Sequence, residues 1–94
     1  MTTLFDHEEH ASRYVMSIDG ALVAVADYRL NGTSISFNHT YTQPAHRGNG
    51  YAAQLVKYAM DDVEATTAKR VLPMCWYVAE WFDANPARAQ LLSR

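Results

Sequence analysis

The sequence has little of what secreted and membrane proteins rely on. A single cysteine, Cys75, cannot form an internal disulfide, so the chain is not a disulfide-stabilised scaffold. No apolar run approaches the length that spans a membrane. The acidic first ten residues lack the apolar core of a signal peptide. We therefore expect a cytoplasmic protein with no membrane partner.

Positive charge is also scarce, because eight Lys and Arg stand against ten Asp and Glu, a formal net charge of −2. Binding to a nucleic-acid backbone needs a concentrated positive face, and no basic cluster exists, so nucleic acid is not an expected partner. With 49% hydrophobic and 19% charged residues, the 94 residues fit one folded domain spanning residues 1–94.

Metal-ligating side chains gather at one place, His7, Glu8, Glu9 and His10. The two histidines are three apart, not four apart on one helical face, and no third ligand is evident. We expect a solvated polar lead-in over residues 1–10, which could include an edge strand, and no metal site.

Two dipeptides that favour hairpin turns, Asp19-Gly20 and Asn31-Gly32, divide the first half. They separate three β-rich segments, residues 13–18, 21–30 and 33–41, and so predict an antiparallel meander. The alternation expected of a half-buried sheet is carried by Val15, Leu22, Ala24, Ile35 and Phe37.

The second half begins with an amphipathic pattern that predicts a helix over about residues 50–67. A short apolar strand follows at residues 71–76. A strand, a helix and a strand imply a crossover, so this strand should run parallel to residues 33–41. Pro73 lacks a backbone donor, which favours an edge position.

The last twenty residues predict two short helices. Residues 77–82 look helical, residues 83–85 interrupt them, and Pro86 opens a final helix through Leu92. Asn85-Pro86 is most simply a turn and helix start.

Two regions should share one crevice. In open α/β sheets, ligands bind outside the carboxyl ends of parallel strands. The loop of residues 43–49 leaves one of the two parallel strands, and Cys75 and Trp76 end the other.

The loop itself carries Gly48 and Gly50 at a strand-to-helix junction. A helix start offers unpaired N–H groups and the positive end of the helix dipole, which suits phosphate. The alternative is that both glycines merely permit a turn. Arg47 is either a phosphate partner or a surface cation capping the loop. His46 is expected to expose its ring.

The pattern Arg47-x-x-Gly50-x-Ala52 resembles the pyrophosphate-binding motif of the GCN5-related N-acetyltransferase (GNAT) superfamily. The Pro-x-Cys stretch ending at Cys75, together with His39-Thr40 and Asn85-Pro86, resembles the small single-domain GNAT-like family of acetyltransferases. The resemblance covers about residues 13–92. It implies an α/β GNAT-like acyl-CoA N-acyltransferase fold: an antiparallel β-meander, a β-α-β crossover and C-terminal helices.

The same resemblance implies acetyl-CoA as cosubstrate, with the pantetheine arm between the two parallel strands and the acyl sulfur near Cys75. Backbone groups at Tyr41 and Thr42 would pair with the pantetheine amides, and N–H groups from Arg47 to Ala52 would hold the pyrophosphate. The expected cofactor-binding residues are Tyr41, Thr42, Arg47, Gly48, Asn49, Gly50, Tyr51, Ala52, Tyr77 and Asn85.

Cys75 and His39 are the candidate catalytic residues. Cys75 is a nucleophile that forms an acyl-cysteine, a hydrogen-bond donor to the departing thiolate, or simply a small buried hydrophobe. His39 is a base for an attacking amine or a structural histidine. Of the aromatic residues at 76, 77, 81 and 82, most should lie in the core and one or two should wall the cofactor's arm.

The resemblance implies transfer of an acetyl group to an amine, by direct attack or through acyl-Cys75. The acceptor, a small molecule or a protein, is not identified by the sequence. Larger relatives carry a tyrosine that protonates the leaving thiolate, whereas Phe82 stands in the comparable stretch and Tyr77 lies one turn early. A non-catalytic CoA-binding or protein-interaction module is therefore the alternative, and a scaffold without cofactor is a third. We expect a monomer or weak dimer.

Overall fold

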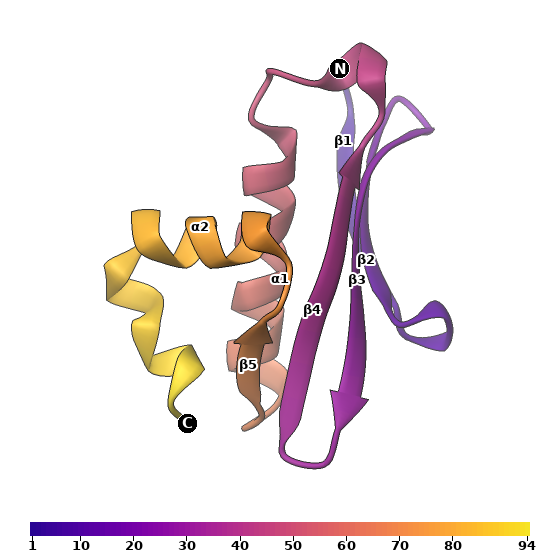
Figure 1. The fold of residues 1–94 in the computed structure, drawn as a ribbon. Coiled ribbons are helices and arrows are strands. Elements are labelled where there is room, and N and C mark those ends of the chain that lie inside the picture. The colour runs from indigo at the N-terminus through magenta and orange to yellow at the C-terminus, as the bar shows by residue number, and fades with distance from the viewer.

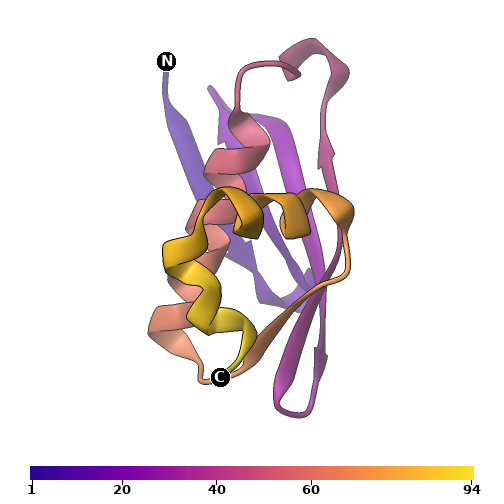
Figure 2. The ribbon, with the colours of Figure 1, turned by 60° about the vertical axis from the view of Figure 1, so that its left-hand side comes forward.

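The computed structural model, which describes residues 1–94, is a five-stranded sheet with both α-helices on one face (Figures 1 and 2). The strands are β1 (Thr3–Glu8), β2 (Arg13–Ile18), β3 (Ala21–Asn31), β4 (Ser34–Thr42) and β5 (Arg70–Pro73). The helices are α1 (Tyr51–Thr66) and α2 (Trp76–Ala84), with short 3-10 turns η1 (Glu9–Ala11), η2 (Pro44–His46) and η3 (Pro86–Leu92).

The strands lie in the order β1-β2-β3-β4-β5, antiparallel from β1 to β4, with β5 parallel to β4. Both hairpins predicted from Asp-Gly and Asn-Gly form, with Gly20 and Gly32 at positive φ. The parallel pair and the edge position of Pro73 are confirmed. β1 forms the opposite edge, so the lead-in does contain a strand.

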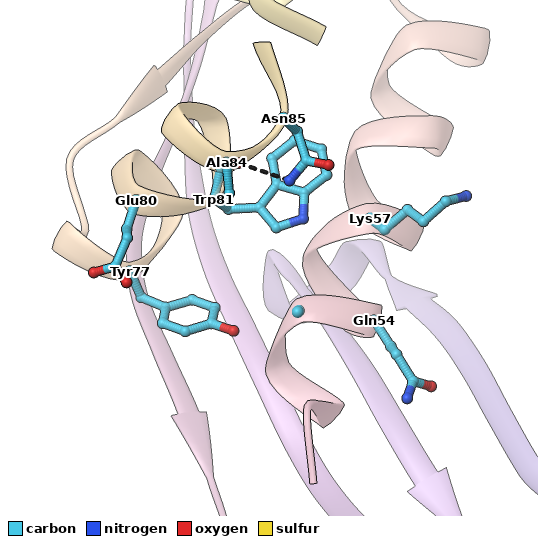
Figure 3. Close-up of a pocket in the computed structure, with 8 residues that line it drawn as sticks. Gln54, Lys57, Tyr77, Glu80, Trp81, Ala84 and Asn85 are labelled. Atoms are coloured by element: carbon cyan, nitrogen blue, oxygen red, sulfur yellow. Dashed lines mark hydrogen bonds between the residues drawn. The ribbon is translucent and has the colours of Figure 1, made fainter. Parts of the chain in front are cut away.

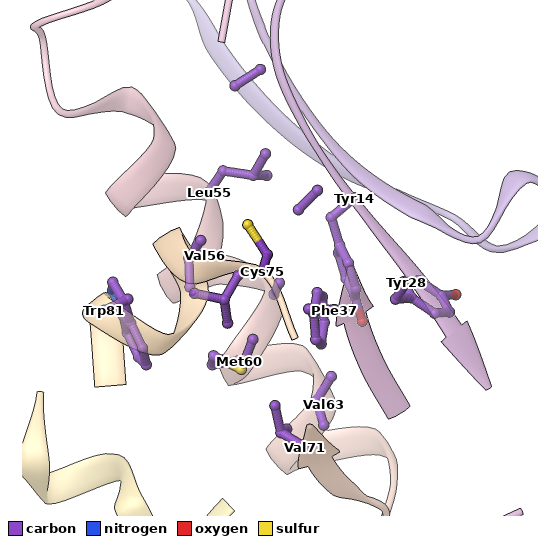
Figure 4. Close-up of a cluster of buried hydrophobic side chains, with 14 of the residues drawn as sticks. Tyr14, Tyr28, Phe37, Leu55, Val56, Met60, Val63, Val71, Cys75 and Trp81 are labelled. Atoms are coloured by element: carbon purple, nitrogen blue, oxygen red, sulfur yellow. The ribbon is translucent and has the colours of Figure 1, made fainter. Parts of the chain in front are cut away.

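The core lies between the sheet and α1 (Figure 4). Helix α1 turns one apolar stripe toward the strands, as its periodicity predicted. The buried residues of this stripe are Leu55, Val56, Ala59, Met60 and Val63. The helix was predicted over about residues 50–67, and Gly50 and Thr67 are the N-cap and C-cap residues of α1.

Two of the predicted inward residues are wrong. Val15 is buried but pairs in register with Val25 on the sheet face opposite the helices, whereas Tyr14 and Met16 belong to the core. Leu22 is 40% exposed. The register slips between Met16 and Ser17 because β3 has one extra residue there, so Leu22 turns outward.

The strand predicted over residues 71–76 is shorter than expected and ends at Pro73. Cys75 instead caps the N-terminus of α2, and Trp76 is the first residue of that helix. The predicted helix over residues 77–82 is thus longer at both ends.

His7 was expected to be solvated, and this is wrong because its ring lies half-buried against the core. Its Nε2 lies 2.6 Å from the Tyr28 hydroxyl and its Nδ1 lies 3.3 Å from a carboxylate oxygen of Asp62. No three His, Cys, Asp or Glu side chains are arranged to hold a metal ion. Neither α-helix has the length and apolarity needed to cross a membrane.

Candidate active site

The two parallel strands separate part of the way along β4. β5 pairs with β4 only as far as Phe37, and the last link is the Cys75 N–H donating to the Phe37 carbonyl over 2.8 Å. β4 continues to Thr42 without β5 beside it. One residue past Phe37, Asn38 has no partner on β3, which marks a β-bulge. Because a bulge bends its strand, it accounts for the separation.

Cys75 lies where the strands part. Its residue is 9% exposed, and its Sγ is 3.5 Å from the Thr40 hydroxyl. Burial raises the pKa of the Cys75 thiol, but the Thr40 hydroxyl and the nearby backbone N–H groups of Tyr77 and Val78 outweigh it and lower the pKa overall. A thiol with a lowered pKa at a helix N-terminus has increased thiolate character, which nucleophilic chemistry requires.

His39 points to the other side of the sheet. Thr40 pairs in register with the buried Ala26 and contacts Cys75, so it faces the helices. His39 pairs with Asp27 and is exposed on the opposite face. The two candidate catalytic side chains therefore lie on opposite sides of β4, and Thr40, which the sequence analysis did not single out, is the residue beside the thiol.

The loop between β4 and α1 presents an array of free donors. Gly48 and Gly50 have φ of +85° and +76°, and Gly50 caps α1 without a side-chain hydrogen bond. None of the backbone N–H groups of residues 48–53 donates to another group of the protein. A Cβ at either glycine would meet open space. Such an array, at the positive end of a 16-residue helix, favours an anion.

Side chains of the loop hold its shape. The Arg47 Nε donates to the Thr42 carbonyl over 3.0 Å, and its guanidinium lies 5.5 Å from the centre of the Tyr41 ring. The Asn49 amide donates to the His46 carbonyl over 3.1 Å. Arg47 therefore folds back over the end of β4 while remaining exposed beside the free donors.

Three neighbouring pockets, which share Tyr77, connect these features. The first, of about 230 Å³, lies at the strand separation against Thr40, Thr42 and Trp76. The second, of about 340 Å³, lies on the loop and includes Tyr51 and Ala52. The third, of about 390 Å³, lies between α1 and α2 (Figure 3). Because they share lining residues, the three pockets are together called the groove.

The third pocket contains Asn85 at its far end, where the Asn85 amide donates to the Trp81 carbonyl over 2.8 Å (Figure 3). Its amide nitrogen thus closes the end of α2, which leaves its oxygen for a ligand. Gln54 and Lys57 of α1 also line this pocket. The sequence analysis missed both, since an exposed polar residue on an amphipathic helix gives no sign of what lies opposite.

Comparison with known proteins finds a solved structure with a similar fold. A solved structure of a ribosomal-protein-alanine N-acetyltransferase from Brucella melitensis biovar Abortus 2308 matches with a TM-score of 0.57 and 22% sequence identity. The match covers 69% of this chain and 50% of that one, so the chain spans about half of that protein's length. At this identity the likeness shows the fold alone. No curated protein matches the sequence.

The family model described as GCN5-related N-acetyl-transferase matches residues 13–91. This range runs from the start of β2 to η3, and so includes the separated strands, the donor loop and Cys75. The chain belongs to the GCN5-related N-acetyltransferase family.

Proposed function

We propose that the protein binds acetyl-CoA in the groove and transfers the acetyl group to an amine. The observation that carries the proposal is the array of free N–H groups at residues 48–53 in one pocket, beside a second pocket lined by Thr40, whose hydroxyl contacts the Cys75 sulfur. A diphosphate accepts several such hydrogen bonds, and Arg47 adds a positive charge beside it. The open space at Gly48 and Gly50 leaves room for the phosphate oxygens.

The pantetheine arm fits the strand separation. An arm with two amides needs backbone partners, and β4 beyond Phe37 has a free edge because β5 has ended. Tyr41 and Thr42 belong to this edge and line the pocket. Tyr77 borders all three pockets and would wall the arm. The nucleotide end then lies toward α2, where Asn85 is available.

Two routes of transfer are compatible with this placement. In the direct route the amine attacks the thioester carbonyl and the bond to the CoA sulfur breaks. In the covalent route the Cys75 thiolate attacks first, CoA leaves as a thiol after taking a proton, and the amine then displaces Cys75. The lowered pKa of Cys75 and its place beside Thr40 favour the covalent route.

A non-catalytic CoA-binding module remains the second candidate. The observation in its favour is Phe82, a buried core residue where larger relatives supply a hydroxyl to the leaving thiolate. In that case the groove binds CoA and the thiol serves only to complete the core.

The test is to incubate the protein with isotope-labelled acetyl-CoA and follow both the protein's mass and an amine acceptor. We expect a labelled acetyl group on Cys75 and none on Cys75→Ala, which should still bind CoA by calorimetry. Transfer that persists at a reduced rate in Cys75→Ala would indicate the direct route. CoA binding without transfer to primary amines or peptides would support the module, and absence of CoA binding would reject the proposal.

A further inference from the structure

The pocket between α1 and α2 has one end at the loop and one end away from it (Figure 3). Tyr77 is the residue that this pocket shares with the pocket on the loop, so it marks the near end. Lys57 and Asn85 mark the far end, because they also line a further pocket of about 380 Å³ that reaches Arg88. A nucleotide whose diphosphate lies on the loop would therefore place its ribose at the near end and its base at the far end.

Glu80 is the charged residue at the near end of this pocket. It follows Tyr77 by one turn of α2 and lines the same pocket. Burial and then the charge of Glu80 raise the pKa of the Tyr77 phenol, so the field of this carboxylate reaches the wall of the groove. Glu80 forms no ion pair that would neutralise it. A ribose that lies against Tyr77 would therefore also lie beside this carboxylate.

The cations around the far end are already paired. The Lys57 ammonium lies 2.9 Å from one carboxylate oxygen of Asp61. The Arg88 guanidinium lies 2.8 Å from the other and 2.9 Å from Glu64. Burial raises the pKa of Asp61, but its hydrogen bonds with Lys57 and Arg88 outweigh burial and lower the pKa, so Asp61 stays charged.

The nucleotide end of the groove therefore has an excess of negative charge. Two cations and three anions line the two pockets at this end or bond to a residue that lines them: Lys57, Arg88, Asp61, Glu64 and Glu80. Arg47 lines the other two pockets of the groove but not this one. A phosphate added to the ribose would thus meet an unpaired carboxylate and no unpaired cation.

The polar groups of this pocket suit hydroxyl and amine donors instead. The Asn85 amide nitrogen is used by the Trp81 carbonyl, so its oxygen is left as an acceptor. Glu80 offers two further acceptor oxygens. In nucleotide-binding folds a carboxylate accepts a hydrogen bond from a free ribose hydroxyl, whereas an arginine accommodates a ribose phosphate. The pocket has the first arrangement.

We propose that Glu80 makes the groove select against a phosphate on the ribose, so that dephospho-CoA, which lacks the 3′-phosphate of CoA, is the tighter ligand. This inference rests on the proposed function, because the diphosphate and the pantetheine arm, which both molecules have, bind as proposed there. Glu80 is then a specificity-determining residue for the nucleotide end of the donor.

The test is calorimetric titration of CoA and of dephospho-CoA into the protein at low and at high salt. At about 20 mM salt we expect dephospho-CoA to bind at least about threefold more tightly, and the difference to shrink at about 0.5 M salt because ions screen the repulsion. Equal affinities at low salt, or tighter binding of CoA, would overturn the inference and leave the proposed function standing. If neither molecule binds, both are rejected.

Glu80→Gln isolates the contribution of the carboxylate. The variant keeps an acceptor oxygen and loses the charge, so CoA should gain at least about threefold in affinity and dephospho-CoA should change by less than about twofold. Asp83→Asn is the matched control, because Asp83 is an exposed residue of the same helix that lines none of the pockets of the groove. It should leave the ratio of the two affinities unchanged. An equal effect of both variants would assign the preference to the overall charge of the protein and overturn the role of Glu80.

Lys57 allows a test of the rival assignment, in which a lysine binds the ribose phosphate. The double variant Lys57→Gln with Asp61→Asn removes one charge of each sign and leaves the net charge of the protein unaltered. We expect the ratio of the two affinities to stay within about twofold of its original value, since Lys57 lies at the far end and is paired. A loss of affinity of about fivefold or more for CoA alone would overturn the inference. The ¹⁵N amide spectrum of each variant shows whether it is folded.

Discussion

The surroundings of Cys75 shift the pKa of its thiol in opposite directions. Burial disfavours its thiolate, and the Thr40 hydroxyl and two N–H groups at the start of α2 favour it. The balance lowers the pKa, so the folded protein holds more thiolate at neutral pH than a free cysteine would. Because the pKa is lowered on folding, the thiolate's contribution to stability is present at high pH and is lost as pH falls through the folded pKa.

Thr40 should be a positioning residue for this thiolate. In Thr40→Val the hydroxyl is lost, so the pKa of Cys75 should rise toward or above that of a free thiol. The ¹³Cβ chemical shift of Cys75, followed against pH, measures it without requiring access to the buried sulfur. Thr42→Val is the control, because Thr42 lines the same pocket and its side chain forms no hydrogen bond with Cys75. An unchanged midpoint in Thr40→Val would contradict the assignment.

The sequence was enough to place Cys75 but not Thr40. The end of a short apolar strand after a crossover puts residue 75 at the carboxyl edge of the sheet. Thr40 reaches it only because Asn38 bulges and fixes which of residues 39 and 40 faces the helices. His39 and Thr40 are both polar, so the sequence pattern does not show which of the two side chains faces the helices.

Among the elements, the loop that precedes α1 provides the evidence for binding of the diphosphate. Gly48 and Gly50 both have positive φ, as does Gly20 in a hairpin remote from the groove. At all three a Cβ would meet open space, so replacement costs backbone strain rather than a clash within the protein. Gly20 is therefore a matched control for Gly50.

Gly50→Ala and Gly20→Ala should each lower the free energy of unfolding by about 1 kcal/mol, since each forces alanine into the left-handed region. Only Gly50→Ala should also weaken CoA, because its methyl group occupies the space proposed for the diphosphate. Denaturant unfolding and calorimetry measure the two quantities. If the two variants bind CoA equally well, Gly50 is only a turn residue.

Sequence patterns predicted the hairpins, α1 and the parallel pair because each has a local cause: positive-φ dipeptides, helical spacing and the crossover. The two register slips, at Val23 and Asn38, have no such local cause. Neither residue is a glycine, and both bulges depend on how neighbouring strands pair. The bulge at Asn38 lies where the strands separate, and no local pattern predicted it; the sequence analysis placed an arm between these strands only through the family resemblance.

At the scale of the whole molecule, a hydrogen-bonded network ties the edge strand to α1. The Tyr14 hydroxyl donates to Asp62 over 2.7 Å, and His7 lies between Asp62 and Tyr28. Burial and then the hydrogen bond to the Asp62 carboxylate raise the pKa of Tyr14, so its phenol stays a donor. Four elements, β1, β2, β3 and α1, each contribute one residue.

Asp62→Ala should destabilise the fold, because it leaves the buried Tyr14 hydroxyl without its acceptor. We expect a loss of about 1–3 kcal/mol in the free energy of unfolding, measured by chemical denaturation. Asp83→Ala, at an exposed site, should change it by less than about 0.5 kcal/mol. CoA affinity should be unchanged, since Asp62 lies roughly 16 Å along α1 from its start. A shared loss of CoA affinity would show that the network also shapes the groove.

The network was not predicted because its members are up to 55 residues apart in sequence, from His7 to Asp62, and nothing local links them. The same holds for the face of the sheet that no helix covers (Figures 1 and 2). Strand alternation indicates that one face is buried, but the placement of both helices on the same side follows from the tertiary packing of α2 against α1 and β5.

The central claim is that a diphosphate binds the free N–H groups at the start of α1 while a thioester arm lies between β4 and β5. The most direct measurement is a ¹⁵N-labelled amide titration with CoA. The account predicts the largest shifts at residues 48–53, with further shifts at Tyr41, Thr42 and Cys75. Shifts confined to the face of the sheet without helices or to the pocket lined by Lys69, or no shifts at a large excess of CoA, would contradict it.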